Sequence, residues 1–313
     1  FFKYGEDMNK RFLSIKGLNN EKLDALELYF PEKKDALVPV LNNISNNYVD
    51  LGNYEYALSA INRAILISEE LNNTPTSNFY VLLNTKAIIL SNLGFYNESL
   101  SLELKILEYR ENSLGIYHDY YITTLNNIAI TYGYLGKHSK SLECSIKSSD
   151  LRLKKYGYNS VKYIYSLIQL SNSYFSLLKH QEAVNILLES SEIYKFNNFN
   201  DLRLEAYLYH MLTKAYINQI NPIEALPYSR YTLKIHLDIY GENHRKTAMV
   251  FNDLATIHSQ MNNLDSAIFY QELSLKIFKE KSGEDHPDYL SAYSNIANYY
   301  DQKGDLNNGL TIK

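Results

Sequence analysis

Apolar side chains recur along most of the chain at spacings of three and four residues, which is the period of an amphipathic helix. Short Leu-Gly junctions interrupt this pattern and read Leu51-Gly52, Leu93-Gly94 and Leu135-Gly136. These glycines are 42 residues apart, and further steps of 42 reach Leu178, Ile220, Asn262 and Gly304. Because each of these residues also separates two helical patterns, the sequence predicts seven 42-residue repeats over residues 36–313.

Each repeat is predicted to be a hairpin of two helices that touch through small side chains. We number the residue fourteen before the junction glycine as position 1, so that repeats start at 38, 80, 122, 164, 206, 248 and 290. Positions 1, 4, 8 and 11 share one helical face, where position 11 is mostly Tyr. Position 8 is small and reads Ser45, Ala87, Ala129, Ser171, Thr213, Ala255 and Ala297. Position 20, on the second helix, is also small and reads Ala57, Ser99, Ser141, Ala183, Ala225, Ala267 and Gly309.

Three loops between repeats share a Gly-x-x-His pattern in the same phase. Their glycines are Gly115, Gly241 and Gly283, and their histidines are His118, His244 and His286. Glycine suits the end of the second helix, and Pro287 suits the first turn of the next helix. We expect the histidines to be polar loop residues that cap a helix end.

The small residues at positions 8 and 20, the Tyr at position 11 and the Leu-Gly junction resemble the tetratricopeptide repeat family. The 42-residue period and the Gly-x-x-His-Pro loop are similar to its kinesin-light-chain type. The resemblance implies an all-α fold, an α-solenoid superhelix of about seven hairpins whose first helices line the concave side. The chain departs from the family by lacking Trp at position 4 and by carrying Leu178 and Ile220 instead of the junction glycine.

The two ends of the chain do not fit whole repeats. Residues 1–35 are helical in character but out of register, so we expect a lead-in or cap there. The seventh repeat would end at 331, but the chain stops at Lys313, and it begins without Met. We therefore expect a longer natural protein, because a half-repeat is a poor end for an array.

Composition narrows the possible partners. A formal net charge of −4 argues against nucleic-acid binding, which usually needs a basic surface. The single cysteine, Cys144, excludes an internal disulfide and suits a reducing compartment such as the cytoplasm. The densest apolar patch, 87–90, is far shorter than a membrane span, so no membrane contact is expected.

No residue pattern in the chain indicates catalysis, and we expect neither an enzyme nor a bound metal or cofactor. The run 133–139 is faintly similar to a phosphate-binding loop, but only two residues separate its glycines and His138 follows Lys137. The loop histidines are at least one repeat apart, too far to share one metal ion. A catalytic Cys144 would need both a His and a group that orients it, and nothing local in the sequence supplies them.

The first helices carry an unusual number of carboxamides on positions away from the 1-4-8-11 face. Together with neighbouring tyrosines they form what we call the amide stripe. Its residues are Asn84, Asn126, Asn127, Tyr165, Gln169, Asn172, Tyr207, Lys214, Asn252, Asp253, Asn295 and Asn298. A carboxamide both donates and accepts hydrogen bonds, so it can hold the backbone of an extended peptide. Alternatively, these amides bridge adjacent repeats or merely reflect compositional bias.

Two interpretations of function follow. The first is an interaction scaffold that binds a peptide or protein segment in a concave groove. Lys214 is the only base at position 9, so a Lys/Arg clamp for a terminal carboxylate, known in this family, is not expected. The second is the sensor or regulatory arm of a larger signalling or defence effector; by resemblance, a caspase-like CHAT protease, a kinase or an NTPase could follow. Self-association through the terminal repeat is a further possibility.

Overall fold

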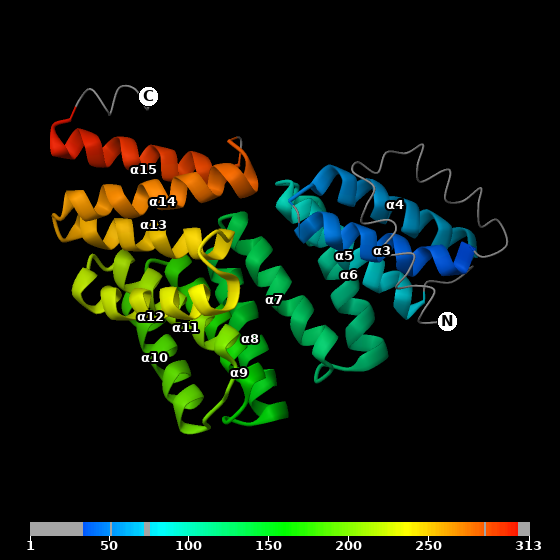
Figure 1. Cartoon of the computed structure of the whole chain (residues 1–313). Coiled ribbons are helices and arrows are strands. Elements are labelled where there is room, and N and C mark those ends of the chain that lie inside the picture. Colours follow the sequence, from blue (N-terminus) through cyan, green and yellow to red (C-terminus); the bar gives the residue numbers. More distant parts are fainter. Residues whose placement is uncertain (1–33, 51, 72–75, 285, 306–313) are drawn as a thin grey trace. The chain divides into compact units, whose positions relative to one another are not determined.

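A computed structural model describes residues 34–50, 52–71, 76–284 and 286–305. These residues form thirteen α-helices and no strand (Figure 1). The helices are α3 (Lys34–Asp50), α4 (Tyr54–Leu71), α5 (Ser77–Asn92), α6 (Tyr96–Leu114), α7 (Asp119–Tyr134), α8 (His138–Tyr156), α9 (Val161–Ser176), α10 (His180–Phe196), α11 (Leu202–Asn218), α12 (Pro222–Tyr240), α13 (Arg245–Gln260), α14 (Leu264–Ser282) and α15 (Pro287–Lys303). The predicted lead-in lies outside the described residues, apart from its last two residues, which begin α3; the last eight residues of the chain also lie outside.

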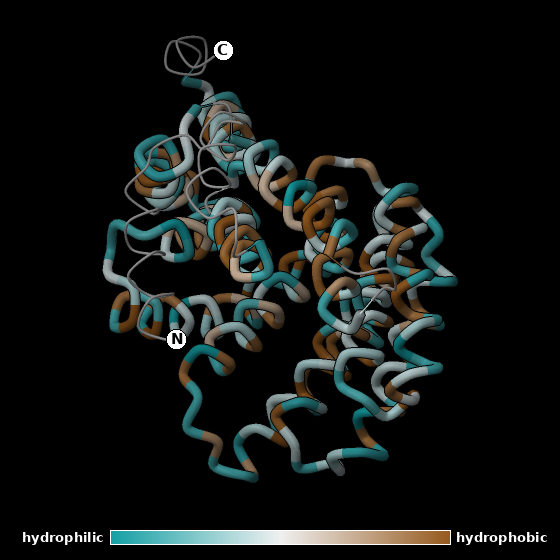
Figure 2. The backbone as a smooth tube through the Cα atoms, turned by 90° about the vertical axis from the view of Figure 1, so that its right-hand side faces the viewer, coloured by the Kyte–Doolittle hydropathy of each residue, from teal (hydrophilic) through white to brown (hydrophobic). Residues whose placement is uncertain are grey.

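The helices fall into two compact units, residues 1–151 and 152–313. In unit 1, α3 pairs with α4 and α5 pairs with α6. In unit 2, α9 pairs with α10, α11 with α12, and α13 with α14. First helices of successive repeats also contact each other. Helix α3 contacts α5, and α11 contacts α13. Along the backbone, hydrophobic and hydrophilic residues alternate within the helices, as amphipathic helices require (Figure 2).

The small residues at positions 8 and 20 are buried where the two helices of a hairpin meet. The Ser45 hydroxyl donates to the carbonyl of Ala57 at 2.9 Å, and the Ser99 hydroxyl donates to the carbonyl of Ala87 at 2.7 Å. All four residues are buried. A side-chain-to-backbone bond of this length requires nearly touching helices, so the expected close approach is confirmed at these hairpins.

All seven junction residues have the positive φ angle of the left-handed backbone region, whether or not they are glycine. The φ angle is 85° at Gly94 and 69° at Gly136, and it is 58° at Leu178 and 54° at Ile220. A Cβ in this region costs roughly 1–2 kcal/mol. Leu178 is 78% exposed and Ile220 is 75% exposed, so packing within the chain does not offset this strain.

Replacing Leu178 or Ile220 with glycine is expected to raise the free energy of unfolding by about 1 kcal/mol each. Relief of the strained φ angle should exceed the extra entropy that glycine gives the unfolded chain. The thermal midpoint of each variant measures the effect. The matched control is Gly94→Leu, which puts a side chain into open space at another junction with a positive φ angle and should lower the midpoint. If the midpoints of both glycine variants are unchanged or lower, the proposed backbone strain at Leu178 and Ile220 is wrong.

The loop histidines cap helices as expected. The Nδ1 atom of His118 accepts from the Tyr120 backbone N–H at 3.2 Å. His244 and His286 accept in the same way, each at 3.1 Å, from the residue two positions later. The glycines of these loops, Gly115, Gly241 and Gly283, end the preceding helices. The Gly-x-x-His pattern is therefore a turn that ends one helix and begins the next.

A donor at position 31 links each of three second helices to the first turn of the helix that follows it. Arg110 donates to the carbonyl of Tyr120 at 3.0 Å, and Arg152 donates to the carbonyl of Lys162 at 3.0 Å. His236 occupies the same position, with its Nδ1 atom 3.1 Å from the carbonyl of Lys246. Burial lowers the pKa of His236, which favours a neutral ring whose Nδ1–H donates.

Candidate functional site

Side chains of neighbouring first helices bond to each other at a separation of 43 residues, which is one repeat plus one. At positions 5 and 6, the Thr85 hydroxyl donates to Asn42 Oδ1 at 3.0 Å. In unit 2, Asn295 Nδ2 donates to Asn252 Oδ1 at 3.2 Å. Further along the helices, Gln260 Nε2 donates to the carbonyl of Ile217 at 2.9 Å. We call the pairs between positions 5 and 6 the repeat ladder.

The repeat ladder also contains an acid and a base. His210 Nδ1 lies 2.9 Å from Asp253 Oδ2, and both side chains are nearly buried, with side-chain exposures of 12% and 8%. The sequence pattern places Asp253 in the amide stripe but does not indicate His210. The 43-residue separation is the signal that would have found the pair, because it recurs at the other rungs.

Several amide-stripe residues therefore make contacts within the array. Asn252 Oδ1 accepts a second bond, from Gln271 Nε2 at 3.0 Å. Asn84 Oδ1 accepts from Arg110 at 3.4 Å. Asn126, Asn127 and Gln169 are half-buried, and Asn126 Oδ1 has no hydrogen-bond partner. Bridging by amides is thus present at these contacts.

Other residues of the stripe leave side chains at the surface. Tyr165, Tyr207, Lys214 and Asn298 are exposed, and Asn172 is half-buried. They lie in unit 2, on α9, α11 and α15. The Tyr207 hydroxyl shares a hydrogen bond with the side chain of Asn172, and burial of this end of the ring raises the pKa of Tyr207. Burial also raises the pKa of Tyr165. Both phenols are therefore neutral at physiological pH and can donate hydrogen bonds.

An acidic and a basic side chain are buried in unit 1, and neither was expected from the helical pattern of the sequence. Glu103 on α6 is 3% exposed; its carboxylate accepts from Thr131, but its Oε2 atom has no partner. Burial raises the pKa of Glu103 to about 7. Two turns later, Arg110 is 4% exposed and donates to Thr124 at 2.6 Å. Glu103 could have been noticed because it is the only acid at position 24 of the repeats, whereas position 31 carries a base again in Arg152 and His236.

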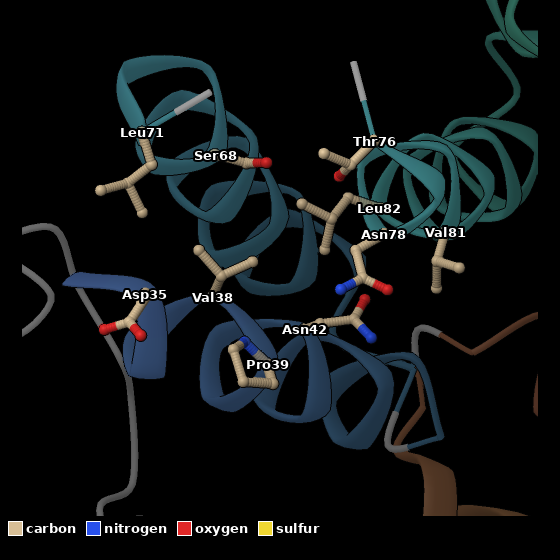
Figure 3. A pocket seen from close by; sticks show the side chains of 10 residues that line it. All are labelled: Asp35, Val38, Pro39, Asn42, Ser68, Leu71, Thr76, Asn78, Val81 and Leu82. Atoms are coloured by element: carbon tan, nitrogen blue, oxygen red, sulfur yellow. The ribbon is translucent and has the colours of Figure 1, made fainter. Parts of the chain in front are cut away.

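Unit 1 also contains a pocket of about 430 Å³ between α3, α4 and the start of α5 (Figure 3). Its lining residues are Asp35, Val38, Pro39, Asn42, Ser68, Leu71, Thr76, Asn78, Val81 and Leu82. The side chains of Asn42 and Asn78 point toward one another across it (Figure 3). The lining is mixed apolar and amide, without a cluster of titratable groups.

The histidines and Cys144 lie in surroundings that do not favour metal binding or thiol chemistry. In the part of the chain that the structure describes, no three His, Cys, Asp or Glu side chains are grouped to hold a metal ion. His258 is buried, and its ring stacks on Tyr270. Cys144 is half-buried, and burial raises the pKa of its thiol, which makes the thiolate scarce. None of the helices in the described ranges is both long and apolar enough to cross a membrane.

Comparison with known protein families identifies the repeats. Two profiles, each described as a tetratricopeptide repeat, match the chain, one over residues 79–144 and 206–280 and the other over residues 38–71. Together the matched segments cover more than half of the 313 residues. No curated protein matches the sequence.

Solved structures share the fold at low sequence identity. A putative kinesin light chain with nearly identical TPR-like repeats from Podosopora anserina is 16% identical, with a TM-score of 0.53; the match covers 63% of this chain and 93% of that one. A STAND signal-transduction ATPase with a tetratricopeptide repeat sensor from Pyrococcus horikoshii is 16% identical, with a TM-score of 0.59 and coverages of 90% and 43%. A Rap protein complexed with Competence and Sporulation Factor is 11% identical, with a TM-score of 0.59 and coverages of 96% and 92%. These likenesses confirm the expected all-α, α-solenoid fold class.

Proposed function

Because the chain belongs to the tetratricopeptide repeat family, we propose that it is a non-catalytic scaffold that holds a peptide or protein segment along its first helices. Positions 5 and 6 of these helices bond to the neighbouring repeat, but positions 2 and 9 leave side chains such as Tyr165, Tyr207 and Lys214 exposed for a partner. A Rap protein of the same fold binds Competence and Sporulation Factor, which supports a partner of this kind by analogy. We place the scaffold in the cytoplasm, in keeping with its single cysteine.

The observation that carries this proposal is the cluster of Tyr165, Asn172 and Tyr207 in unit 2, with the exposed Lys214 two turns after Tyr207 on α11. Tyrosine rings supply apolar contact area together with a hydroxyl donor, and such side chains are enriched where proteins bind one another. The Asn172 amide can donate to and accept from a peptide backbone without requiring a particular sequence. Lys214 is exposed and adds an attraction for an acidic group. The cluster thus suits an extended segment with one apolar side chain and one acidic side chain.

The proposal is tested with random twelve-residue peptides displayed on phage and selected on the wild-type protein. Selected peptides are expected to bind an Asn172→Ala, Tyr207→Ala double variant at least tenfold more weakly in fluorescence anisotropy. The matched control is Asn185→Ala, an exposed amide on the second helix of the same repeat, which should leave affinity unchanged. Circular dichroism establishes that each variant is folded. If the selected peptides bind the double variant within twofold of wild type, the proposed binding site along the first helices is wrong.

A second candidate function is a sensor arm within a larger signalling effector. The likeness to the STAND ATPase favours it, because 90% of this chain matches only 43% of a protein described as having a tetratricopeptide repeat sensor. Sequencing the gene and its transcript on both sides of the present 313 residues tests this candidate. An adjoining protease, kinase or NTPase domain would support it, and stop codons or non-coding sequence on both sides would refute it.

A further inference from the structure

Three large apolar side chains stand almost fully in solvent at one edge of unit 2. Leu178 is 78% exposed, Ile220 is 75% exposed and Ile223 is 74% exposed. Leu178 and Ile220 hold the same junction position in successive repeats, and Ile223 lies in the first turn of α12. We call these three residues the junction ridge. Exposed apolar side chains that recur at one edge mark an interaction surface more often than scattered ones do.

The backbone at the junction ridge supplies an independent argument. Leu178 and Ile220 have φ angles of 58° and 54°, where the other described junctions have glycine or, once, asparagine. Glycine would adopt this conformation without strain, so the two side chains lower the stability of the fold. They are too exposed to gain packing within the chain. Strain that the fold does not need points to a role outside it.

The spacing of the junction ridge suits a helix. First helices of successive repeats pack side by side, and packed helices are about 8–10 Å apart. Two turns of an α-helix rise by a similar distance, about 10 Å over seven residues. A helix lying along this edge would therefore contact Leu178 and Ile220 through side chains two turns apart, with Ile223 beside them.

The charges beside the junction ridge indicate the sign of the charge that a partner would carry. Glu182 and Glu224 are exposed, each four residues after a ridge residue and at the same position of its repeat. Within four residues of a ridge residue along the chain, Glu182 and Glu224 face a single Lys, Lys179, so with His180 neutral this stretch is acidic on balance. We propose that the junction ridge docks an amphipathic helix of a partner protein that carries apolar side chains two turns apart and Lys or Arg beside them.

This surface is separate from the amide stripe, so either proposal can fail alone. A library of helical peptides, displayed on phage with randomised surface positions, is selected on the wild-type protein. The enriched peptides are expected to carry apolar residues seven apart, flanked by Lys or Arg. One enriched peptide is then synthesised, and its Kd is measured against each variant by fluorescence anisotropy.

The central variant is the double substitution Leu178→Gly, Ile220→Gly. It should bind at least tenfold more weakly while its thermal midpoint rises, which separates lost binding from lost folding.

Glu182→Gln with Glu224→Gln should weaken binding about threefold at low salt and less at high salt. Phe196→Ala is the matched control, since it removes an 80% exposed side chain at the other end of α10, and it should leave the Kd unchanged. The groove variant Asn172→Ala, Tyr207→Ala should also bind normally.

Three results would overturn the proposal. The first is that enriched peptides bind the glycine double variant within twofold of wild type, or that no peptide is enriched. The second is enrichment of acidic helices. The third is a wild-type dimer in analytical ultracentrifugation that the glycine double variant abolishes, because the ridge would then be occupied by a second copy of the chain.

Discussion

Replacing Arg110 with alanine is expected to lower the free energy of unfolding of unit 1 by about 3 kcal/mol. The guanidinium joins three elements, because it donates to Thr124, to the carbonyl of Tyr120 and, more weakly, to Asn84. It also lies over the Tyr120 ring, 5.2 Å from its centre. Alanine would remove all of these contacts and leave a cavity between α6 and α7. Urea unfolding, followed by circular dichroism, measures the loss.

Arg110→Met distinguishes packing from hydrogen bonding at this site. Methionine fills much of the same volume and removes a charge whose burial is unfavourable, as shown by the lowered pKa of Arg110. Thr124 would keep its own bond to the carbonyl of Tyr120 at 2.8 Å. We therefore expect Arg110→Met to cost only about 1 kcal/mol. An alanine variant as stable as wild type would show that these contacts contribute nothing.

Glu103→Gln is expected to stabilise the protein at pH 8 and to leave it unchanged near pH 4.5. The pKa of Glu103 rises from 4.5 to about 7 in the fold because burial disfavours its charge. The folded state therefore binds more protons than the unfolded state between these values, and stability falls as the pH rises through this range. At 1.36 kcal/mol per pKa unit, the full loss above pH 7 is on the order of 3 kcal/mol.

Glutamine keeps the shape of the protonated acid and carries no charge, so it should recover this loss. The measurement is the urea midpoint of wild type and variant at several pH values between 4.5 and 8. The matched control is Glu111→Gln, an exposed acid on the same helix, which should change little at any pH. A gain for Glu103→Gln that is equal at both ends of the range would show that burial of the charge is not the cause.

The sequence predicts the hairpins well because their determinants repeat and act locally. Small residues at positions 8 and 20 report directly on helix contact, as the bond between Ser45 and Ala57 shows. The cap at His118 depends only on residues within one turn. The left-handed junction persists even where glycine is missing, because pairing of the flanking helices sets the backbone of Leu178 more strongly than its side chain does.

The candidate site is harder to predict because helical periodicity assigns a face of one helix but not what lies against it. Position 6 lies away from the hairpin core, so Asp253 was expected in the amide stripe. The neighbouring first helix covers it instead, and His210 meets its carboxylate. Each pair joins position 5 of one repeat to position 6 of the next repeat. This offset of one residue follows from how neighbouring repeats pack, and the pattern within a single repeat does not reveal it. Buried charges such as Glu103 escape a search that looks for charges only on the outer face.

The repeat ladder has a consequence for how this chain can evolve. In unit 2 its successive positions hold Ile168 and Met211, which belong to one apolar core, then the pair His210 and Asp253, and then the amides Asn252 and Asn295. Loss of the 42 residues 206–247 would keep every helix in phase but would set Asp253 against Ile168. A buried carboxylate facing an isoleucine is strongly unfavourable. Equal repeat lengths would permit duplication and deletion, but the unlike rungs prescribe one order of repeats, so a rearrangement that shuffles them is expected to destabilise the fold.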